Sequence, residues 1–199
     1  IPVVMVDISD AAVAKGLATV AGSLERLLKK EKISAADKDA ALARIKGSTS
    51  YDDLKGAGLV IEAATENHEL KVRILKQIDA IVEPEVIIAS NTSSISITKL
   101  AAVTSRPDRF IGMHFFNPVP MMALVEIIRG LQTSDATHAA VEALAKALGK
   151  TPITVKNAPG FVVNRILVPM INEAFFVLAE GLATPEDIDA GMKLGCNQP

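Results

Sequence analysis

The sequence predicts a doubly wound α/β fold, in which helices cover both faces of a parallel sheet, followed by the beginning of an all-helical domain. Short apolar strands alternate with helix-length amphipathic segments as far as about residue 156. The strands are almost continuously apolar, which is typical of parallel strands buried on both faces. Beyond Lys-Asn-Ala-Pro-Gly at 156–160 only helical spacing remains. We therefore expect a domain boundary near 157–160, dividing the chain into segments 1–158 and 159–199.

The individual elements are predicted from apolar spacing, turn residues and helix caps. Strands are expected at 3–9, 59–64, 86–92, 109–116, 123–128 and 153–155. Helices are expected from Asp10 as N-cap to about 31, from Ser34 as N-cap to about 45, at 67–82, briefly before 109, and at 135–149 and 160–181. A last helix is expected to begin at Thr184-Pro185, because Thr is a favoured N-cap and Pro a favoured first helical residue.

Composition restricts the class of protein. Apolar residues make up 49% of the 199 residues and charged residues 22%, which permits a packed core and disfavours disorder. The net charge of −2 gives no electrostatic reason to expect nucleic acid or a membrane as partner. The single cysteine, Cys196, excludes an intrachain disulfide and a cysteine-based zinc site. It fits a reducing, cytoplasmic compartment, although a chain that begins inside a strand does not test for a targeting signal.

Polar side chains gather where the predicted strands end, the edge at which α/β folds bind ligands. Asp7 ends the first strand, where an acidic residue binds the ribose hydroxyls of a dinucleotide; a helix cap or turn is the alternative. Glu66 and Lys71 flank the start of a helix, and a solvated first turn is the alternative for both. Ser93 lies in the hydroxyl-rich turn 90–96, which fits either turn chemistry or a grip on a substrate oxygen.

His114 and Glu126 are ionisable residues on two consecutive apolar strand segments. Neighbouring strands lie about 4.8 Å apart, so the two side chains can meet. A carboxylate beside an imidazole orients the ring, as a general base that takes a proton from an alcohol requires. A structural histidine with its partner is the alternative. His68 and His138 lie among polar helix residues and are expected at the surface.

Asn164 interrupts an apolar helix turn, and Lys29, Lys30 and Lys32 form a basic cluster at a predicted helix end. A buried Asn has to hydrogen-bond to the backbone or to a substrate, since leaving it unpaired costs about 1–3 kcal/mol. The lysines are either solvated beside a helix terminus that favours cations or contact the phosphates of a long anionic ligand.

Five sequence strings resemble, in order and spacing, the motifs of the 3-hydroxyacyl-CoA dehydrogenase family. They are VIEAATEN (60–67), ASNTSSISIT (89–98), GMHFFNPVP (112–120), VKNAPGFVVNRIL (155–167) and MKLG (192–195). The resemblance runs from residue 1 to 199 and is closest to short-chain bacterial members. It implies a Rossmann-like domain and the NAD-dependent oxidation of a (3S)-3-hydroxyacyl-CoA, such as 3-hydroxybutyryl-CoA, to the 3-ketoacyl-CoA, or the reverse.

The resemblance also implies a role for each matching residue. His114 would be the general base, Glu126 its orienting partner, Ser93 the contact to the reacting oxygen and the nicotinamide, and Asn164 a substrate contact. The implied NAD contacts are Asp7, Glu66, Lys71, Ser93 and Asn117, and the implied CoA contacts are Ser23 and Lys30. Asp7 without a nearby Arg favours NAD over NADP. No metal site is expected.

The chain departs from the family pattern at both ends. The family's first strand and its phosphate loop are missing, since no Gly-x-Gly-x-x-Gly occurs in the 199 residues. That strand is central in a doubly wound sheet, so we expect the sheet to split and to expose two edges. The helical domain, which in the family forms most of a homodimer interface, stops early. We therefore expect a piece of a longer dehydrogenase that binds NAD poorly and turns over slowly or not at all by itself.

Two other functions remain as alternatives. One is a non-catalytic, crystallin-like relative that serves as a binding or structural protein, although such a protein has no use for Ser93, His114, Glu126 and Asn164 together. The other is a dehydrogenase of a hydroxy acid without CoA, against which Ser23 and the lysine cluster weigh modestly.

Overall fold

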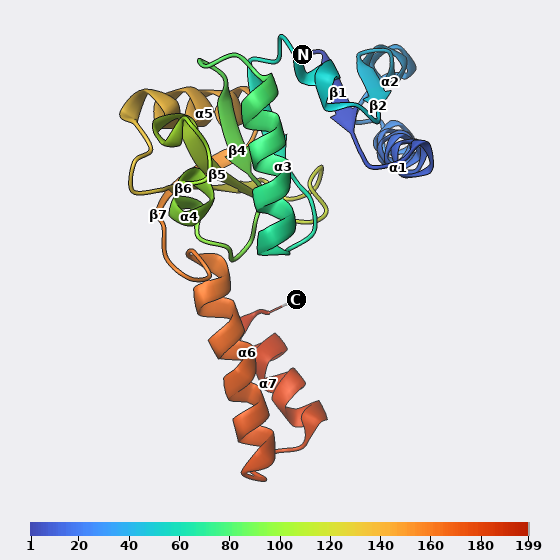
Figure 1. Ribbon diagram of the computed structural model, residues 1–199. Coiled ribbons are helices and arrows are strands. Elements are labelled where there is room, and N and C mark those ends of the chain that lie inside the picture. Colours follow the sequence, from blue (N-terminus) through green and yellow to red (C-terminus); the bar gives the residue numbers. More distant parts are fainter. Residues whose placement is uncertain (199) are drawn as a thin grey trace.

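Seven strands form two separate sheets in the computed structural model, which describes residues 1–198 (Figure 1). Strands β1 and β2 form a parallel pair, and the second sheet has the order β3-β4-β5-β6-β7. Helices flank both sheets, and a helical hairpin follows them. The predicted fold class is therefore confirmed, and so is the expected split of the sheet, with β1 and β3 each at the edge of its own sheet.

The elements lie close to the predicted segments, with shorter strands. The strands are β1 (Val3–Val6), β2 (Ile45–Ser48), β3 (Leu59–Glu62), β4 (Ile87–Ser90), β5 (Phe110–Phe115), β6 (Leu124–Arg129) and β7 (Thr151–Lys156). The α-helices are α1 (Asp10–Lys29), α2 (Ala35–Leu42), α3 (His68–Ile81), α4 (Ile97–Ala101), α5 (Asp135–Ala147), α6 (Val163–Ala179) and α7 (Pro185–Cys196). Two 3₁₀ helices are η1 (Tyr51–Leu54) and η2 (Pro107–Arg109).

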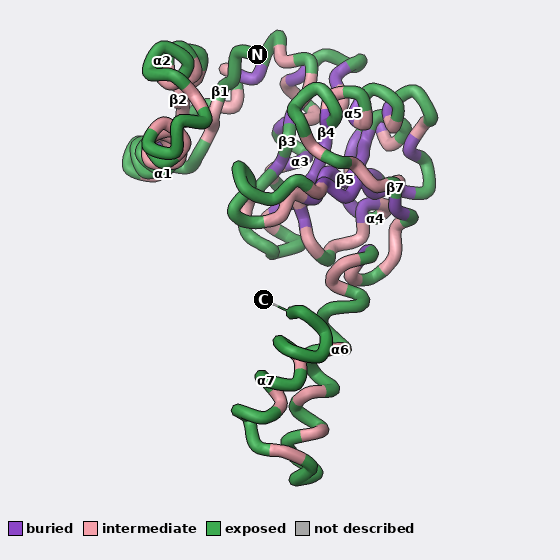
Figure 2. The backbone as a smooth tube through the Cα atoms, turned by 180° about the vertical axis from the view of Figure 1, so that it is seen from behind, coloured by how far each residue is buried: buried purple, intermediate pink, exposed green. Residues whose placement is uncertain are grey.

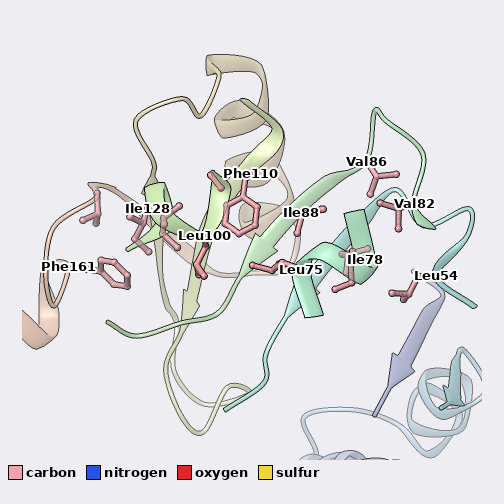
Figure 3. Close-up of a cluster of buried hydrophobic side chains, with 14 residues drawn as sticks. Leu54, Leu75, Ile78, Val82, Val86, Ile88, Leu100, Phe110, Ile128 and Phe161 are labelled. Carbon is pink, nitrogen blue, oxygen red and sulfur yellow. The ribbon is translucent and has the colours of Figure 1, made fainter. Parts of the chain in front are cut away.

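The five-stranded sheet has a hydrophobic core on each face. On one face α3 and α4 cover the sheet, and Leu75, Leu100 and Phe110 are fully buried there (Figure 3). On the other face α5 contributes Val141 and Ala145 to a second cluster. Because successive strand residues point to opposite faces, each central strand supplies apolar residues to both clusters. This arrangement makes the strands continuously apolar, as the sequence shows.

A separate lobe consists of β1, α1, α2 and β2 (Figure 1). Helix α1 approaches β2 so closely that a Cβ atom added to Gly47 would lie 2.3 Å from Cγ1 of Val13. Met5 of β1 likewise packs against Gly16 of α1. The two glycines therefore allow helix and strands to pack closely in a lobe in which Val13 is the one buried core residue among those described.

Three predictions in this lobe were wrong in detail. The helix that begins after Ser34 ends at Leu42, and Ile45–Ser48 is a strand that the sequence analysis missed. Its sequence Ile-Lys-Gly-Ser lacks the β-branched alternation that marks a strand, and pairing with β1 forms it instead. The N-cap of α1 is Ser9, whose hydroxyl accepts a hydrogen bond from the Ala12 amide, rather than Asp10.

The sheet is also not wholly parallel, because β5 and β6 run antiparallel. Parallel neighbours need a crossover of a dozen or more residues. Only residues 116–123 connect these two strands, which is too short for a helix crossover. This reversal places the facing residues of β5 and β6 in a defined register that determines the site described below.

The helical hairpin of α6 and α7 extends away from the sheets, and Figure 2 shows no buried segment along it. Large apolar side chains of α6 are exposed, among them Ile166 (65%) and Phe175 (66%). The Thr184 N-cap and Pro185 at the first position of α7 are as predicted. Within residues 1–198, no helix has the length and apolarity that crossing a bilayer requires.

The close approach at Gly47 has a testable consequence. Replacing Gly47 with Ala should lower the free energy of unfolding by about 1–3 kcal/mol, the usual cost of overpacking, because Val13 occupies the space of the new methyl group. Urea unfolding measures this. The matched control is Gly58→Ala, where nothing lies within 4 Å. Equal midpoints for the two variants would contradict the packing described for the lobe.

Candidate active site

His114 and Glu126 face each other across the antiparallel pair of β5 and β6. The Nδ1 atom of His114 lies 2.7 Å from Oε2 of Glu126. Glu126 is fully buried and His114 is 6% exposed. The two side chains that the sequence analysis placed on adjacent strands therefore do meet, in direct register and at hydrogen-bond distance.

The carboxylate of Glu126 has a second contact that the sequence analysis did not predict. Its Oε1 atom accepts hydrogen bonds from the backbone amides of Val162 and Val163, each at 3.0 Å. These amides are at the start of α6, which has no side-chain cap of its own. One buried carboxylate therefore orients the His114 ring and satisfies the N-terminus of the first helix of the helical domain, where a negative charge is favoured.

The turn before α6 brings these amides to Glu126. Gly160 and Phe161 both have positive φ angles, 73° and 52°. At Gly160 an added Cβ would lie 2.9 Å from the Arg165 amide nitrogen, so only glycine fits without a shift. Phe161 is buried in the core of the sheet domain. The segment is thus tied to the sheet from both sides of the turn.

The remaining imidazole nitrogen is available for chemistry. If Nδ1 donates its proton to the carboxylate, Nε2 of the neutral ring carries a lone pair. Nε2 forms no hydrogen bond in this structure. Since every buried side-chain nitrogen and oxygen within residues 1–198 has a hydrogen-bond partner, Nε2 is not buried and is accessible to solvent. The ring centroids of Phe116 and Phe161 lie 4.5 and 5.8 Å from that of His114 and form apolar walls.

Ser93 and Glu66 contact each other at the neighbouring strand ends. Glu66 accepts hydrogen bonds from the Ser93 amide, the Ser93 hydroxyl (2.9 Å) and the Thr92 hydroxyl (2.8 Å). Partial burial by itself raises the pKa of Glu66, but these hydrogen bonds and the charge of Lys71 outweigh it and hold the pKa below the ordinary value of 4.5. The turns after β3 and β4 are therefore joined through an ionised carboxylate.

Lys71 does not lie in the solvated first turn that was the alternative to a cofactor contact. It is fully buried rather than in a solvated turn, and its Nζ donates to Glu62 (2.8 Å) and to the Ala64 carbonyl oxygen (2.9 Å). Lys71 is connected to the ligand-binding edge of the sheet through Glu66, whose Oε2 lies 3.7 Å from the Nζ atom of Lys71.

The other expected site residues are divided between the β1–β2 lobe and the segments that adjoin His114 and Glu126. Asp7, directly after β1, and Lys30, at the end of α1, are exposed on the β1–β2 lobe. Ser23 of the same lobe accepts a hydrogen bond from Arg26 (2.9 Å). Asn117 is exposed in the loop after β5. Asn164 is half-buried in the first turn of α6, adjacent to Val163, whose amide Glu126 binds.

Two asparagines were missed although they hold the site together. Asn91 accepts a hydrogen bond from the Phe115 amide (2.8 Å), one residue after His114. Asn157 accepts from the Ile97 amide (2.8 Å) and donates to the Ser96 hydroxyl (3.1 Å), joining the linker before α6 to the start of α4. An Asn in a loop has no sequence signal that identifies a partner tens of residues away.

The comparisons with known proteins agree with this geometry. Residues 1–158 match the model of the "3-hydroxyacyl-CoA dehydrogenase, NAD binding domain", and residues 160–199 match that of the corresponding C-terminal domain. The chain belongs to the 3-hydroxyacyl-CoA dehydrogenase family. The resemblance that its motifs suggested is thereby confirmed, together with the NAD-binding character of the first domain.

Similar proteins carry related names. The 3-hydroxybutyryl-CoA dehydrogenase of Bradyrhizobium diazoefficiens is 49% identical over 99% of this chain, which spans 67% of that protein. The fatty acid oxidation complex subunit alpha of Acinetobacter baylyi is 46% identical, with 27% of its length covered. The crystal structure of (S)-3-hydroxybutyryl-CoA dehydrogenase from Ralstonia eutropha is 81% identical, with a TM-score of 0.98 over all of this chain and 70% of that one.

The double contact of Glu126 predicts that two substitutions separate its two roles. Glu126→Ala should lower the free energy of unfolding by about 1–3 kcal/mol, because the Val162 and Val163 amides lose their acceptor. Glu126→Gln should cost much less, since its carbonyl oxygen still accepts both bonds. Urea unfolding of both variants measures this; equal losses would show that the amide contacts contribute little.

Proposed function

We propose that the protein to which this chain belongs oxidises a (3S)-3-hydroxyacyl-CoA to the 3-ketoacyl-CoA with NAD, or catalyses the reverse reaction. A short acyl chain, such as 3-hydroxybutyryl, is favoured by the names of the relatives at 49% and 81% identity. The observation that carries the proposal is the buried His114–Glu126 pair with a free Nε2. Family membership supplies the reaction class in which such a pair is used.

His114 acts in this proposal as the general base. Its Nε2 accepts the proton of the 3-hydroxyl group while Nδ1 remains bonded to Glu126, whose negative charge stabilises the imidazolium that forms. NAD would supply the acceptor for the hydride that leaves C3. Phe116 and Phe161 exclude water from the ring faces of His114. In the reverse direction the same imidazolium returns the proton to the keto oxygen.

The residues at the carboxyl edge of the strands fit a dinucleotide. Asp7 is exposed, and its carboxylate can accept more bonds than the one from the Ile8 amide (2.7 Å), so it suits ribose hydroxyls. Glu66 and Ser93 lie at the ends of β3 and β4, and we propose both, with Lys71 behind them and Asn117, as parts of the NAD site. Ser93 and Asn164 are also proposed to hold the substrate near His114.

The long CoA moiety is assigned to the β1–β2 lobe. Lys30 is exposed there at the end of α1, and Ser23 lies two turns earlier on the same helix. The ammonium group of a lysine forms strong, charge-assisted hydrogen bonds with phosphate. This assignment supports an acyl-CoA over a free hydroxy acid as substrate.

The domain organisation and assembly are proposals as well. Residues 1–158 would bind the cofactor, and residues 159–199 would begin the substrate and dimerisation domain. Exposed apolar side chains on α6, such as Ile166 and Phe175, favour burial against further protein, and a homodimer provides it. We place the protein in the cytoplasm, where its single cysteine stays reduced, without nucleic acid or membrane as partner.

The assignment of the base is tested by His114→Gln in the full-length protein. Loss of the base should reduce kcat by about 10²–10⁴-fold with little change in the KM for acetoacetyl-CoA. NADH oxidation measures both. The control is His138→Gln on α5, whose histidine bonds Thr154 (2.8 Å) away from the site and should leave kcat unchanged. A variant at His114 that kept most of kcat would refute the assignment.

The 199 residues alone should bind NAD much more weakly than the full-length protein. They contain no Gly-rich phosphate loop, and β1 is not paired with β3. Fluorescence titration of NADH against both proteins measures the difference. Equal dissociation constants would contradict the expectation that these residues bind NAD poorly by themselves.

A further inference from the structure

A buried ionic network lies behind the proposed NAD site, at the carboxyl end of β3. Glu62 is the last residue of that strand, and its side chain is 1% exposed. Its Oε1 accepts from Lys71 Nζ (2.8 Å) and from the Ala64 amide (2.6 Å), and its Oε2 accepts from the Ser90 hydroxyl (2.6 Å). The sequence analysis gave Glu62 no role.

Register explains how the network forms. Glu62 and Ser90 are paired residues at the ends of the parallel strands β3 and β4. Lys71 is in the first turn of α3, which packs on the same face, so its ammonium group comes between β3 and the loop that follows it. All the donors and acceptors of this cluster belong to the segments from which the ligand edge is built.

The network continues outward to the proposed site. Lys71 Nζ is 3.7 Å from Oε2 of Glu66. Glu66 in turn binds the amide and hydroxyl of Ser93. A single chain of charges and hydrogen bonds therefore runs from the interior, through Glu62 and Lys71, to the exposed Glu66 and the half-buried Ser93, which are assigned to the cofactor and the reacting oxygen.

Stability alone explains this cluster poorly. Burying two charges costs several kcal/mol per ion before their attraction offsets it, and well-packed apolar residues often stabilise as much or more. Lys71 has two carboxylates around it, so its charge is shared between Glu62 and Glu66. The position of Glu66 then depends on how firmly Glu62 holds the ammonium group.

We propose that Glu62 is a positioning residue for the NAD site: it fixes Lys71, which fixes Glu66 and through it Ser93. The inference rests on the proposed function for the roles of Glu66 and Ser93. Glu62 itself touches no ligand, and its effect on turnover passes through these side chains.

The test uses Glu62→Gln in the full-length protein. Gln keeps the shape and an acceptor for Lys71, while the amide group can donate to the Ser90 hydroxyl, so chiefly the charge is lost. The KM and the dissociation constant for NADH should rise roughly tenfold or more, because Glu66 is displaced. The KM for acetoacetyl-CoA should rise less than that for NADH, since the CoA lobe is untouched and Ser93 is the one proposed substrate contact that is affected. Ser90→Ala removes the hydrogen bond to Glu62 (2.6 Å) and a longer one from the Thr92 amide (3.4 Å), but no charge. It should give a smaller rise in the same direction, and it covers the case in which Glu62→Gln does not fold.

The matched control is Asp79→Asn, toward the other end of α3. Asp79 pairs with the buried Arg106 (2.7 Å), and the two side chains are 14% and 7% exposed. Loss of this charge should lower the unfolding midpoint without changing either KM. Unchanged NADH affinity in both Glu62→Gln and Ser90→Ala, or the same kinetic change in Asp79→Asn, would overturn the inference. A wild type that binds NADH but does not turn over acetoacetyl-CoA would instead refute the proposed function, and NADH titration would still test the role of Glu62.

Discussion

The candidate site depends on the hydrogen bonds that the buried carboxylate of Glu126 accepts. A fully buried carboxylate is stable only when hydrogen bonds replace the water it has lost. Glu126 obtains them from His114 on one oxygen and from the Val162 and Val163 amides on the other. One oxygen therefore binds the histidine and the other binds the start of α6. A change in either contact would move the carboxylate and so disturb the other contact.

This geometry has consequences for both parts of the chain. The histidine is held in one orientation by a group on a rigid strand, which suits a base that has to meet a substrate proton at hydrogen-bond distance. The helical domain is attached to the same carboxylate, because the amides at the start of α6 donate hydrogen bonds to Glu126. A substrate that contacts Asn164 on α6 would consequently act on an element that is already connected to the base.

The sequence predicted most of the strands because their apolar runs are strong signals, and it predicted that His114 and Glu126 meet because both lie in such runs. It did not predict that β5 and β6 are antiparallel, although the short connection between them contains that information. Strand β2 was missed because its formation depends on pairing with β1 rather than on its own residues. The burial of Lys71 was not predicted, because a position in the first turn of a helix does not reveal which face is buried. The amide contacts of Glu126 join residues 36 and 37 positions apart, and local patterns carry no signal for them.

The central claim is that His114, held by Glu126, is the base that exchanges a proton with the 3-oxygen of an acyl-CoA. A crystal structure of the full-length protein with NAD and acetoacetyl-CoA tests it directly. We expect Nε2 of His114 within about 2.6–3.2 Å of the 3-keto oxygen, with Nδ1 still bonded to Glu126. A complex in which that oxygen lies beyond the reach of His114, or in which the His114–Glu126 bond is broken, would contradict it.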